Sequence, residues 1–234
     1  MTDLTPLKNK ITELEIVPPL DFYDMVEIYL ARLIEKNKTM SLTAVAESEM
    51  VARHFADSVE VAARLDFAGK TAIDIGSGAG FPGLPLRLLF SDLRLTLLDS
   101  TAKKLVFVGE VVSELGLGGV TLLPMRAEEA AHDPRFREVF DIALARGVAA
   151  MPALCELCLP FVGVEGTFVA YKMAAAREDI ESGRRAAGLL GGNYEWEREY
   201  MVSNAANILV GVKKISQTSG KYPRKYAQIK QNPL

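Results

Sequence analysis

The sequence predicts an α/β fold with a doubly wound, mostly parallel sheet of seven strands and a helical extension in front of it. From Gly69 onward, short β-prone segments alternate with helical patterns, which is typical of a parallel sheet covered by helices on both faces. Before Gly69, apolar residues recur only at helical spacing. We therefore expect a helical extension at 1–68 that packs on the core, a sheet domain at 69–215 and a basic C-terminal tail at 216–234.

Two helical patterns make up the extension, with a polar, turn-prone link around Lys36-Asn37-Lys38-Thr39 between them. The first helix carries Phe22, Met25, Val26, Tyr29, Leu30 and Leu33 on one face, and the second runs from Glu47 to Leu65 with Met50, Val51, Phe55, Val59 and Ala62.

The sheet domain is predicted to hold strands at 71–75, 94–98, 120–123, 139–145, 166–171, 194–202 and 206–212. Helices are expected at 82–90, 101–115, 149–159 and 174–190. Only Ser203-Asn204 separates the last two strands, so we expect an antiparallel hairpin at the sheet edge. This ending is typical of the Rossmann-like fold of methyltransferases and not of nicotinamide dehydrogenases.

A glycine-rich turn with Gly76, Gly78 and Gly80 follows the first predicted strand. Glycines there allow a ligand to approach the backbone, and ligands of such sheets bind beyond the carboxyl ends of the strands. The spacing Gly78-x-Gly80-x-x-Gly83 also satisfies the dinucleotide fingerprint. Asp99, about 20 residues on, could accept the ribose hydroxyls of NAD or of S-adenosylmethionine, so the turn alone leaves both open.

Three features favour S-adenosylmethionine. Asp74 lies directly before the turn, where a carboxylate suits the cationic amino-acid end of that donor and repels a pyrophosphate. Glu128-Glu129 follows the third strand, where it could meet an adenine edge, although Glu129 is equally a solvated helix residue. The chain also lacks a separate substrate domain for hydride chemistry. An NAD-dependent oxidoreductase stays as the alternative.

Charge and composition limit the classes of partner and the cellular compartment that we expect for this protein. The net charge of −3 does not indicate nucleic-acid binding, yet the residues after Glu199 include six basic and no acidic side chains. With no signal peptide or membrane-spanning stretch, we expect a cytoplasmic protein. The two cysteines, Cys155 and Cys158, lack further ligands nearby, so we expect two buried apolar side chains and no metal. No coiled-coil pattern argues for assembly, and we expect a monomer.

Several motifs together resemble the RsmG (GidB) family of bacterial small-subunit ribosomal RNA guanine-N7 methyltransferases. The resemblance spans nearly the whole chain. Its motifs are Ser41-Leu42-Thr43-Ala44, Arg53-His54-Phe55-Ala56-Asp57-Ser58, Asp74-Ile75-Gly76-Ser77-Gly78-Ala79-Gly80-Phe81-Pro82-Gly83-Leu84-Pro85, Leu97-Leu98-Asp99-Ser100 with Lys103-Lys104, Arg126-Ala127-Glu128-Glu129, Ala145-Arg146-Gly147-Val148-Ala149, Tyr171-Lys172, and Lys221-Tyr222-Pro223-Arg224-Lys225 with Asn232-Pro233-Leu234. The chain departs from the family at Ser41, Met173 and Tyr226-Ala227-Gln228-Ile229.

The resemblance implies methyl transfer from S-adenosylmethionine to N7 of a guanine in the 530-loop region of 16S rRNA, with that RNA or the small ribosomal subunit as partner. A methyltransferase for a small molecule or a protein is the other alternative, favoured by the acidic net charge. The resemblance implies donor binding by Gly76, Phe81, Ala127, Glu128 and Arg146, with Asp99 and Ser100 on the ribose; we add Asp74, Gly78 and Gly80 of the turn.

On the acceptor side, guanine N7 already carries a lone pair, so no general base is expected. His54 and Asp57 share one helix face, either as a polar cluster at the catalytic crevice or as a pair that anchors the helix, and Lys172 could contact a phosphate. The cationic and aromatic C-terminal motif suits RNA, but such a tail could equally lack fixed structure. The RNA-binding candidates are Arg53, Lys103, Lys104, Lys172, Lys221, Arg224 and Lys225.

Overall fold

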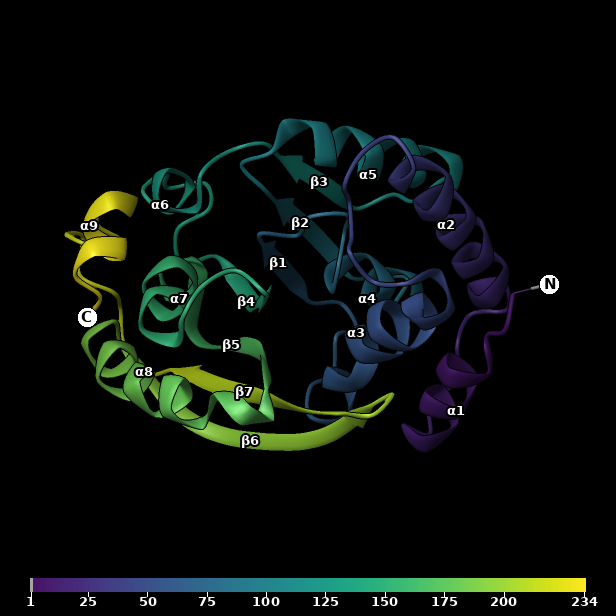
Figure 1. The fold of residues 1–234 in the computed structure, drawn as a ribbon. Coiled ribbons are helices and arrows are strands. Elements are labelled where there is room, and N and C mark those ends of the chain that lie inside the picture. Colours follow the sequence, from purple (N-terminus) through teal and green to yellow (C-terminus); the bar gives the residue numbers. More distant parts are fainter. Residues whose placement is uncertain (1) are drawn as a thin grey trace.

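A seven-stranded sheet with the order β3-β2-β1-β4-β5-β7-β6 forms the centre of the computed structural model, which describes residues 2–234 (Figure 1). The pairs from β3 to β5 are parallel, and β7 runs antiparallel to both β5 and β6. This confirms the predicted doubly wound, mostly parallel sheet and its closing hairpin. The strands are β1 (Thr71–Ile75), β2 (Arg94–Leu98), β3 (Val120–Leu123), β4 (Phe140–Arg146), β5 (Val162–Met173), β6 (Gly192–Val202) and β7 (Ala205–Lys214).

The helices connect and cover these strands. They are α1 (Thr5–Glu13), α2 (Phe22–Asn37), α3 (Asp57–Val59), α4 (Gly83–Leu89), α5 (Ala102–Glu114), α6 (Ala127–Ala130), α7 (Met151–Cys158), α8 (Arg177–Leu189) and α9 (Tyr226–Gln231). Helix α1 was not predicted. Strand β5 is longer than expected, because it already pairs with Phe140 of β4 at Val162, before a bulge in that ladder. Within residues 2–234, no helix is both long and apolar enough to span a membrane.

Two apolar clusters hold the helices on opposite faces of the sheet (Figure 1). Successive strand residues point to opposite faces, so Ala72 joins one cluster and Ile73 the other. The first cluster buries α1, α2, α4 and α5, and the second buries α7 and parts of α8 and α9. The N-terminal helices thus share their core with the sheet, and they lie over the half that carries the glycine turn.

The single helix expected from Glu47 to Leu65 is wrong. The chain forms a 3₁₀ turn at Glu47–Glu49, a π-helical segment at Val51–Ala56, α3 and a second 3₁₀ turn at Glu60–Ala63. A reason is the completely buried Glu60, whose carboxylate pairs with Lys10 at 2.6 Å and Arg198 at 2.7 Å. Those contacts come from α1 and β6, and no local pattern records them. π-helical turns occur frequently at functional sites.

The C-terminal residues fold back onto the body and do not extend away from it. The guanidinium of Arg137 donates to the carbonyls of Thr218 at 2.8 Å and Tyr222 at 3.0 Å. Helix α9 buries Ile229 completely and lies beside α6 and α7 (Figure 1). The basic C-terminal motif is therefore presented in an ordered position.

Candidate functional site

The glycine turn joins β1 to α4 and is tied to the end of β2. The amides of Gly76 and Ser77 donate to the carbonyl of Leu98, and the amide of Gly78 donates to Asp99 Oδ2 at 2.9 Å. The second oxygen of Asp99 accepts from the amide of Thr101 at 2.7 Å. Asp99 thus shapes the turn, and each of its oxygens keeps a lone pair for a ligand hydroxyl.

Side chains from two other parts of the chain press against this turn. A Cβ on Gly76 would lie 2.6 Å from Val148 Cγ2, and one on Gly80 would lie 2.7 Å from the Tyr29 hydroxyl. That hydroxyl donates to the carbonyl of Ala79, so α2 holds the turn directly. Glycine at these two places allows the N-terminal helices and the loop after β4 to approach.

Asp74 lies beneath the turn and does not line the pockets described below. Its side chain is completely buried, and its Oδ2 accepts the amide hydrogen of Gly83 at 2.8 Å. Burial raises the pKa of Asp74 to about 7, against the opposing effects of that hydrogen bond and of the Arg146 charge. Within residues 2–234, Asp74 Oδ1 and Ser77 Oγ are buried without a hydrogen-bond partner. Both atoms could accept a donor from a bound molecule.

A pocket of about 250 Å³, here called the cofactor pocket, opens at the carboxyl ends of β1 and β2 beside the turn. Five of the ten predicted cofactor residues line it, and they are Gly76, Asp99, Ser100, Ala127 and Glu128. Lys104, predicted for RNA, also lines it. Its carboxylates, backbone groups and apolar wall suit a nucleoside with hydroxyls.

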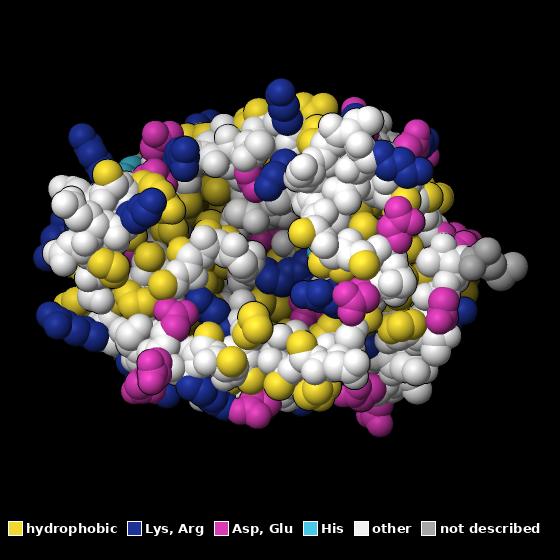
Figure 2. Space-filling view, in the orientation of Figure 1, with side chains coloured by type: hydrophobic (Ala, Val, Ile, Leu, Met, Phe, Trp, Pro, Cys, Tyr) yellow, Lys and Arg dark blue, Asp and Glu magenta, His cyan; other side chains and the backbone are white. Residues whose placement is uncertain are grey.

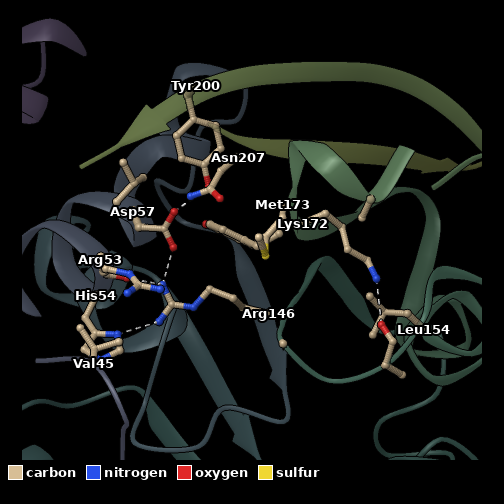
Figure 3. A pocket seen from close by; sticks show the side chains of 15 residues that line it. Val45, Arg53, His54, Asp57, Arg146, Leu154, Lys172, Met173, Tyr200 and Asn207 are labelled. Carbon is tan, nitrogen blue, oxygen red and sulfur yellow. Dashed lines mark hydrogen bonds and ion pairs between the residues drawn. The ribbon is translucent and has the colours of Figure 1, made fainter. Parts of the chain in front are cut away.

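A second pocket of about 420 Å³, here called the acceptor pocket, lies between β4, β5, the closing hairpin and the π-helical segment (Figure 3). Figure 2 shows the hollow in the middle of this face, with Lys and Arg side chains inside it. Arg53, His54, Asp57 and Lys172 all line it, as does Arg146, which was predicted for the donor. The structure thus gathers the acceptor candidates in one place.

Arg146 forms the centre of a charged network in this pocket. Its Nη1 donates to Asp57 Oδ2 at 2.5 Å and to the carbonyl of Arg53 at 3.1 Å. Asp57 Oδ1 accepts from the Tyr200 hydroxyl at 2.7 Å. The guanidinium also lies over the ring of Phe81, 5.6 Å from its centroid. The network therefore joins β4, β6 and the extension around the acceptor pocket.

His54 stacks on Phe81 and stays neutral. The two ring centroids are 4.6 Å apart, and Phe81 also stacks on Tyr29 with centroids 5.1 Å apart. Burial, with the nearby charges of Arg146 and Arg53, lowers the pKa of His54 to about 3. Its Nδ1 faces the Arg146 guanidinium at 3.4 Å, so the ring carries its proton on Nε2, which contacts Thr43 Oγ1 at 2.8 Å. His54 and Asp57 therefore anchor the segment and also line this pocket; their place at a catalytic crevice stays a prediction.

Lys172 is the penultimate residue of β5, and its charge is already paired. Its ammonium donates to Asp179 at 2.7 Å and to the carbonyl of Ala149 at 2.8 Å. The pair links α8 to the loop after β4, which also forms the wall of the acceptor pocket.

The cofactor pocket and the acceptor pocket meet at Gly147, which lines both. Gly147 follows β4 with a φ of +68°, and a Cβ placed there would have no protein atom within 4 Å. That open space is where two bound molecules could touch. Among residues 2–234, no other residue is common to the linings of these two pockets.

The remaining RNA candidates lie away from this junction. Lys221, Arg224 and Lys225 line a third pocket of about 680 Å³ beside α6, here called the outer pocket. Arg224 is tied to the buried Glu156 by hydrogen bonds of 2.6 and 2.8 Å, whereas Lys103 is exposed on α5. Cys155 and Cys158 are buried in α7, and residues 2–234 hold no cluster of His, Cys, Asp or Glu suited to a metal ion.

Several residues of the site were not predicted from the sequence. Tyr29, Tyr200 and Asn207 contact the turn or the acceptor pocket, and Arg126 and Tyr226 line the cofactor pocket. Thr43 belongs to a motif that was noted, but its contact with His54 was not foreseen. For the tyrosines no local signal exists, since an aromatic residue in a strand or helix indicates a core position equally well.

The chain matches known proteins over most of its length. The family described as rRNA small subunit methyltransferase G, GidB, matches residues 23–196. A ribosomal RNA small subunit methyltransferase G of Acetivibrio thermocellus is 40% identical over 205 residues, covering 86% of this chain and 84% of that protein. The protein of the same name from Thermoanaerobacter pseudethanolicus is 39% identical over 244 residues, covering 97% and 100% of the two chains.

Solved structures share the fold at low sequence identity. TrmN from Thermus thermophilus superposes with a TM-score of 0.54 at 18% identity, covering 70% of this chain and 53% of that one. The pyocyanin biosynthetic protein PhzM superposes with a TM-score of 0.56 at 18% identity, covering 82% and 62%. These likenesses concern the fold alone, whereas the sequence matches decide against an oxidoreductase. By those matches, the chain belongs to the GidB family, rRNA small subunit methyltransferase G.

Proposed function

We propose that this enzyme transfers the methyl group of S-adenosylmethionine to N7 of a guanine in the 530-loop region of 16S rRNA. The single observation that carries the proposal is the meeting of two pockets at Gly147. One pocket has the features that suit an adenosine, and the other has room for a base. The relatives' names, which refer to small-subunit ribosomal RNA, support the RNA as the acceptor.

The residues present fit the methyl donor. Asp99 keeps lone pairs for the ribose hydroxyls, and Ala127 and Glu128 would face the adenine. Asp74 Oδ1 and Ser77 Oγ are the buried polar atoms that lack a partner near the turn. We propose that Asp74, Ser77 and the turn Gly76–Gly80, with Phe81 packed behind it, hold the amino-acid end, directly or through ordered water.

Methyl transfer to N7 requires the protein to position the two reactants. It does not require the protein to move a proton. When bound, S-adenosylmethionine supplies a sulfonium methyl: the S–CH₃ bond breaks, the N7–CH₃ bond forms, and the positive charge passes to the guanine. The chain must hold the acceptor in line and keep water out. His54, with its pKa at about 3, is neutral near neutral pH and lines the acceptor pocket without accepting a proton. No residue is needed as a base.

The hydrogen bonds that Arg146 already makes have a chemical consequence in this proposal. Arginine often donates to guanine O6 and N7, and a donor on N7 would occupy the lone pair that must attack the methyl group. Both hydrogens of Arg146 Nη1 are already used by Asp57 and Arg53. A third hydrogen, on Nη2, faces His54 Nδ1. We propose that these contacts leave fewer donors that could occupy N7, while the cation remains close enough to attract RNA phosphate.

Contacts with the RNA backbone come from cations around the hollow. Arg53 and Lys172 line the acceptor pocket, whereas Lys221 and Lys225 lie on the ordered C-terminal segment. Lys103 and Lys104 lie at the start of α5, near the cofactor pocket. Such cations attract phosphates without reading sequence.

The test is the methylation state of 16S rRNA in cells that lack the gene. N7-methylguanine in the 530-loop region should be missing there, and should return when the wild-type gene is supplied. A plasmid encoding Asp99→Ala, which removes the proposed ribose acceptor, should fail to restore it. Unchanged methylation in the deletion strain would refute the RNA assignment. Binding of S-adenosylhomocysteine by the purified protein would then still support a methyltransferase for another acceptor.

A further inference from the structure

Tyr226 belongs to the last helix, α9, yet it lines the cofactor pocket. The Arg126 guanidinium, at the end of the loop after β3, lies over this ring, 5.9 Å from the centroid. Arg126 lines the same pocket, and its side chain and that of Tyr226 are both exposed. An aromatic ring and a guanidinium therefore lie together at the pocket wall.

The protein holds Tyr226 in this place from both sides. Two residues before it, the amide and guanidinium of Arg224 donate to the completely buried carboxylate of Glu156 at 2.6 to 2.8 Å. Three residues after it, Ile229 is completely buried in the cluster around α7. Each anchor fixes the backbone close to Tyr226, so the ring does not need the ligand to bring it there.

The position of Tyr226 also says which end of a ligand it would meet. Gly147 joins the cofactor pocket to the acceptor pocket and so marks the methyl end. Tyr226 and Glu128 join the cofactor pocket to the outer pocket, at a boundary that does not include Gly147. We take this boundary as the other end of the pocket. For S-adenosylmethionine, the end opposite the amino acid and the methyl group is the adenine.

We infer that Tyr226 and Arg126 form a wall of the cofactor pocket that contacts the adenine of the donor. The C-terminal segment then completes the cofactor site as well as presenting cations to RNA. A purine presents a flat π surface, against which a phenol ring or a guanidinium plane can pack. The inference rests on the proposed function, since it takes the occupant of this pocket to be S-adenosylmethionine.

Calorimetry on the full chain with S-adenosylhomocysteine tests the inference. Tyr226→Ala should raise Kd about fivefold, the effect of one aromatic contact. Tyr226→Phe should bind like the wild type, because the ring remains. Gln228→Ala is the matched control on the same helix, since Gln228 lines the outer pocket but not the cofactor pocket. Tyr226→Ala should also weaken the binding of 5′-methylthioadenosine about fivefold, because this compound lacks the amino acid but keeps the adenine.

The outcomes separate the two proposals. A wild-type protein that does not bind S-adenosylhomocysteine would remove the proposed function itself. If Tyr226→Ala binds S-adenosylhomocysteine with the same Kd as the wild type, the inference is overturned and the proposed function is not affected. Thermal unfolding without ligand checks that the variant is folded. If Tyr226→Ala does not fold, Arg126→Gln tests the same pocket wall from another part of the chain. An unchanged Kd of Arg126→Gln for S-adenosylhomocysteine would count against the inference.

Discussion

The carboxylate of Asp57 accepts one hydrogen bond of 2.5 Å from Arg146 and one of 2.7 Å from Tyr200. Asp57 is almost completely buried, and the Arg146 side chain is 19% exposed. The three residues come from the helical extension, β4 and β6, so this carboxylate connects the parts of the chain that surround the acceptor pocket. Its loss should affect both stability and the shape of that pocket.

Asp57→Ala should lower the free energy of unfolding by about 2 kcal/mol, because it leaves the Arg146 charge without its partner. The partial exposure of Arg146 keeps the loss below that of a fully buried pair. Tyr200→Phe removes only a neutral donor and should cost about 1 kcal/mol. Urea denaturation measures both. A larger loss for Tyr200→Phe than for Asp57→Ala would contradict the view that the ion pair dominates.

Gly147→Ala should abolish most methyl transfer while the protein stays folded. The added Cβ meets no protein atom, but it enters the space where the two pockets join. The φ of +68° makes alanine cost about 1 kcal/mol. Gly116→Ala is the control: it has a φ of +60° and equally open surroundings at the end of α5. Equal methylation rates for the two variants would show that Gly147 does not lie on the reaction path.

Asp74→Asn should change how stability depends on pH. Burial raises the pKa of Asp74 to about 7 in the folded protein, from about 3.8 in the unfolded chain. The raised pKa means that the folded state favours the protonated carboxyl, so its contribution is full below pH 3.8 and is lost as the pH rises through 7.

The difference in unfolding free energy between Asp74→Asn and the wild type isolates the titration of Asp74 from that of other groups. His54 acts in the opposite direction, since its lowered pKa makes its contribution fade as the pH falls from 6.5 towards about 3. Measured from pH 4 to 8, the free energy of unfolding of Asp74→Asn should rise relative to that of the wild type. This difference should become constant above about pH 7. A constant difference would mean that Asp74 titrates normally.

Lys225→Gln and Arg224→Gln should behave differently, although both residues were predicted to bind RNA. Lys225 is exposed, so its loss should leave stability unchanged and reduce the salt dependence of RNA affinity by about one counterion. Arg224→Gln strips the buried Glu156 of its charged partner and should cost about 3 kcal/mol. Filter binding across a salt series, with thermal unfolding of each variant, compares them. If Arg224→Gln were as stable as Lys225→Gln, the pair with Glu156 would not anchor the C-terminal segment.

Strands β1, β2 and β3 could be predicted from the sequence because they are short, rich in apolar residues and bounded by turn residues. Strands β1, β2 and β3 begin and end where the pattern places them. The segment from Glu47 to Ala63 could not, since Glu60 and Asp57 pair with residues on α1, β4 and β6 that no local pattern records. A periodic apolar pattern indicates a helix but does not show which polar side chains will be buried.

By itself, the sequence determined the fold class, the glycine turn and the carboxylates at the strand ends, because spacing along a strand or helix sets which side chains share a face. Only the tertiary structure decided that Arg146 lies in the acceptor pocket, that Gly147 joins two pockets, and that Tyr29, Tyr200 and Tyr226 surround the site. Asp57 and Tyr200 are 143 positions apart. Contacts at such separation depend on how two helical layers and a hairpin pack around one sheet, and local propensities carry no record of that packing.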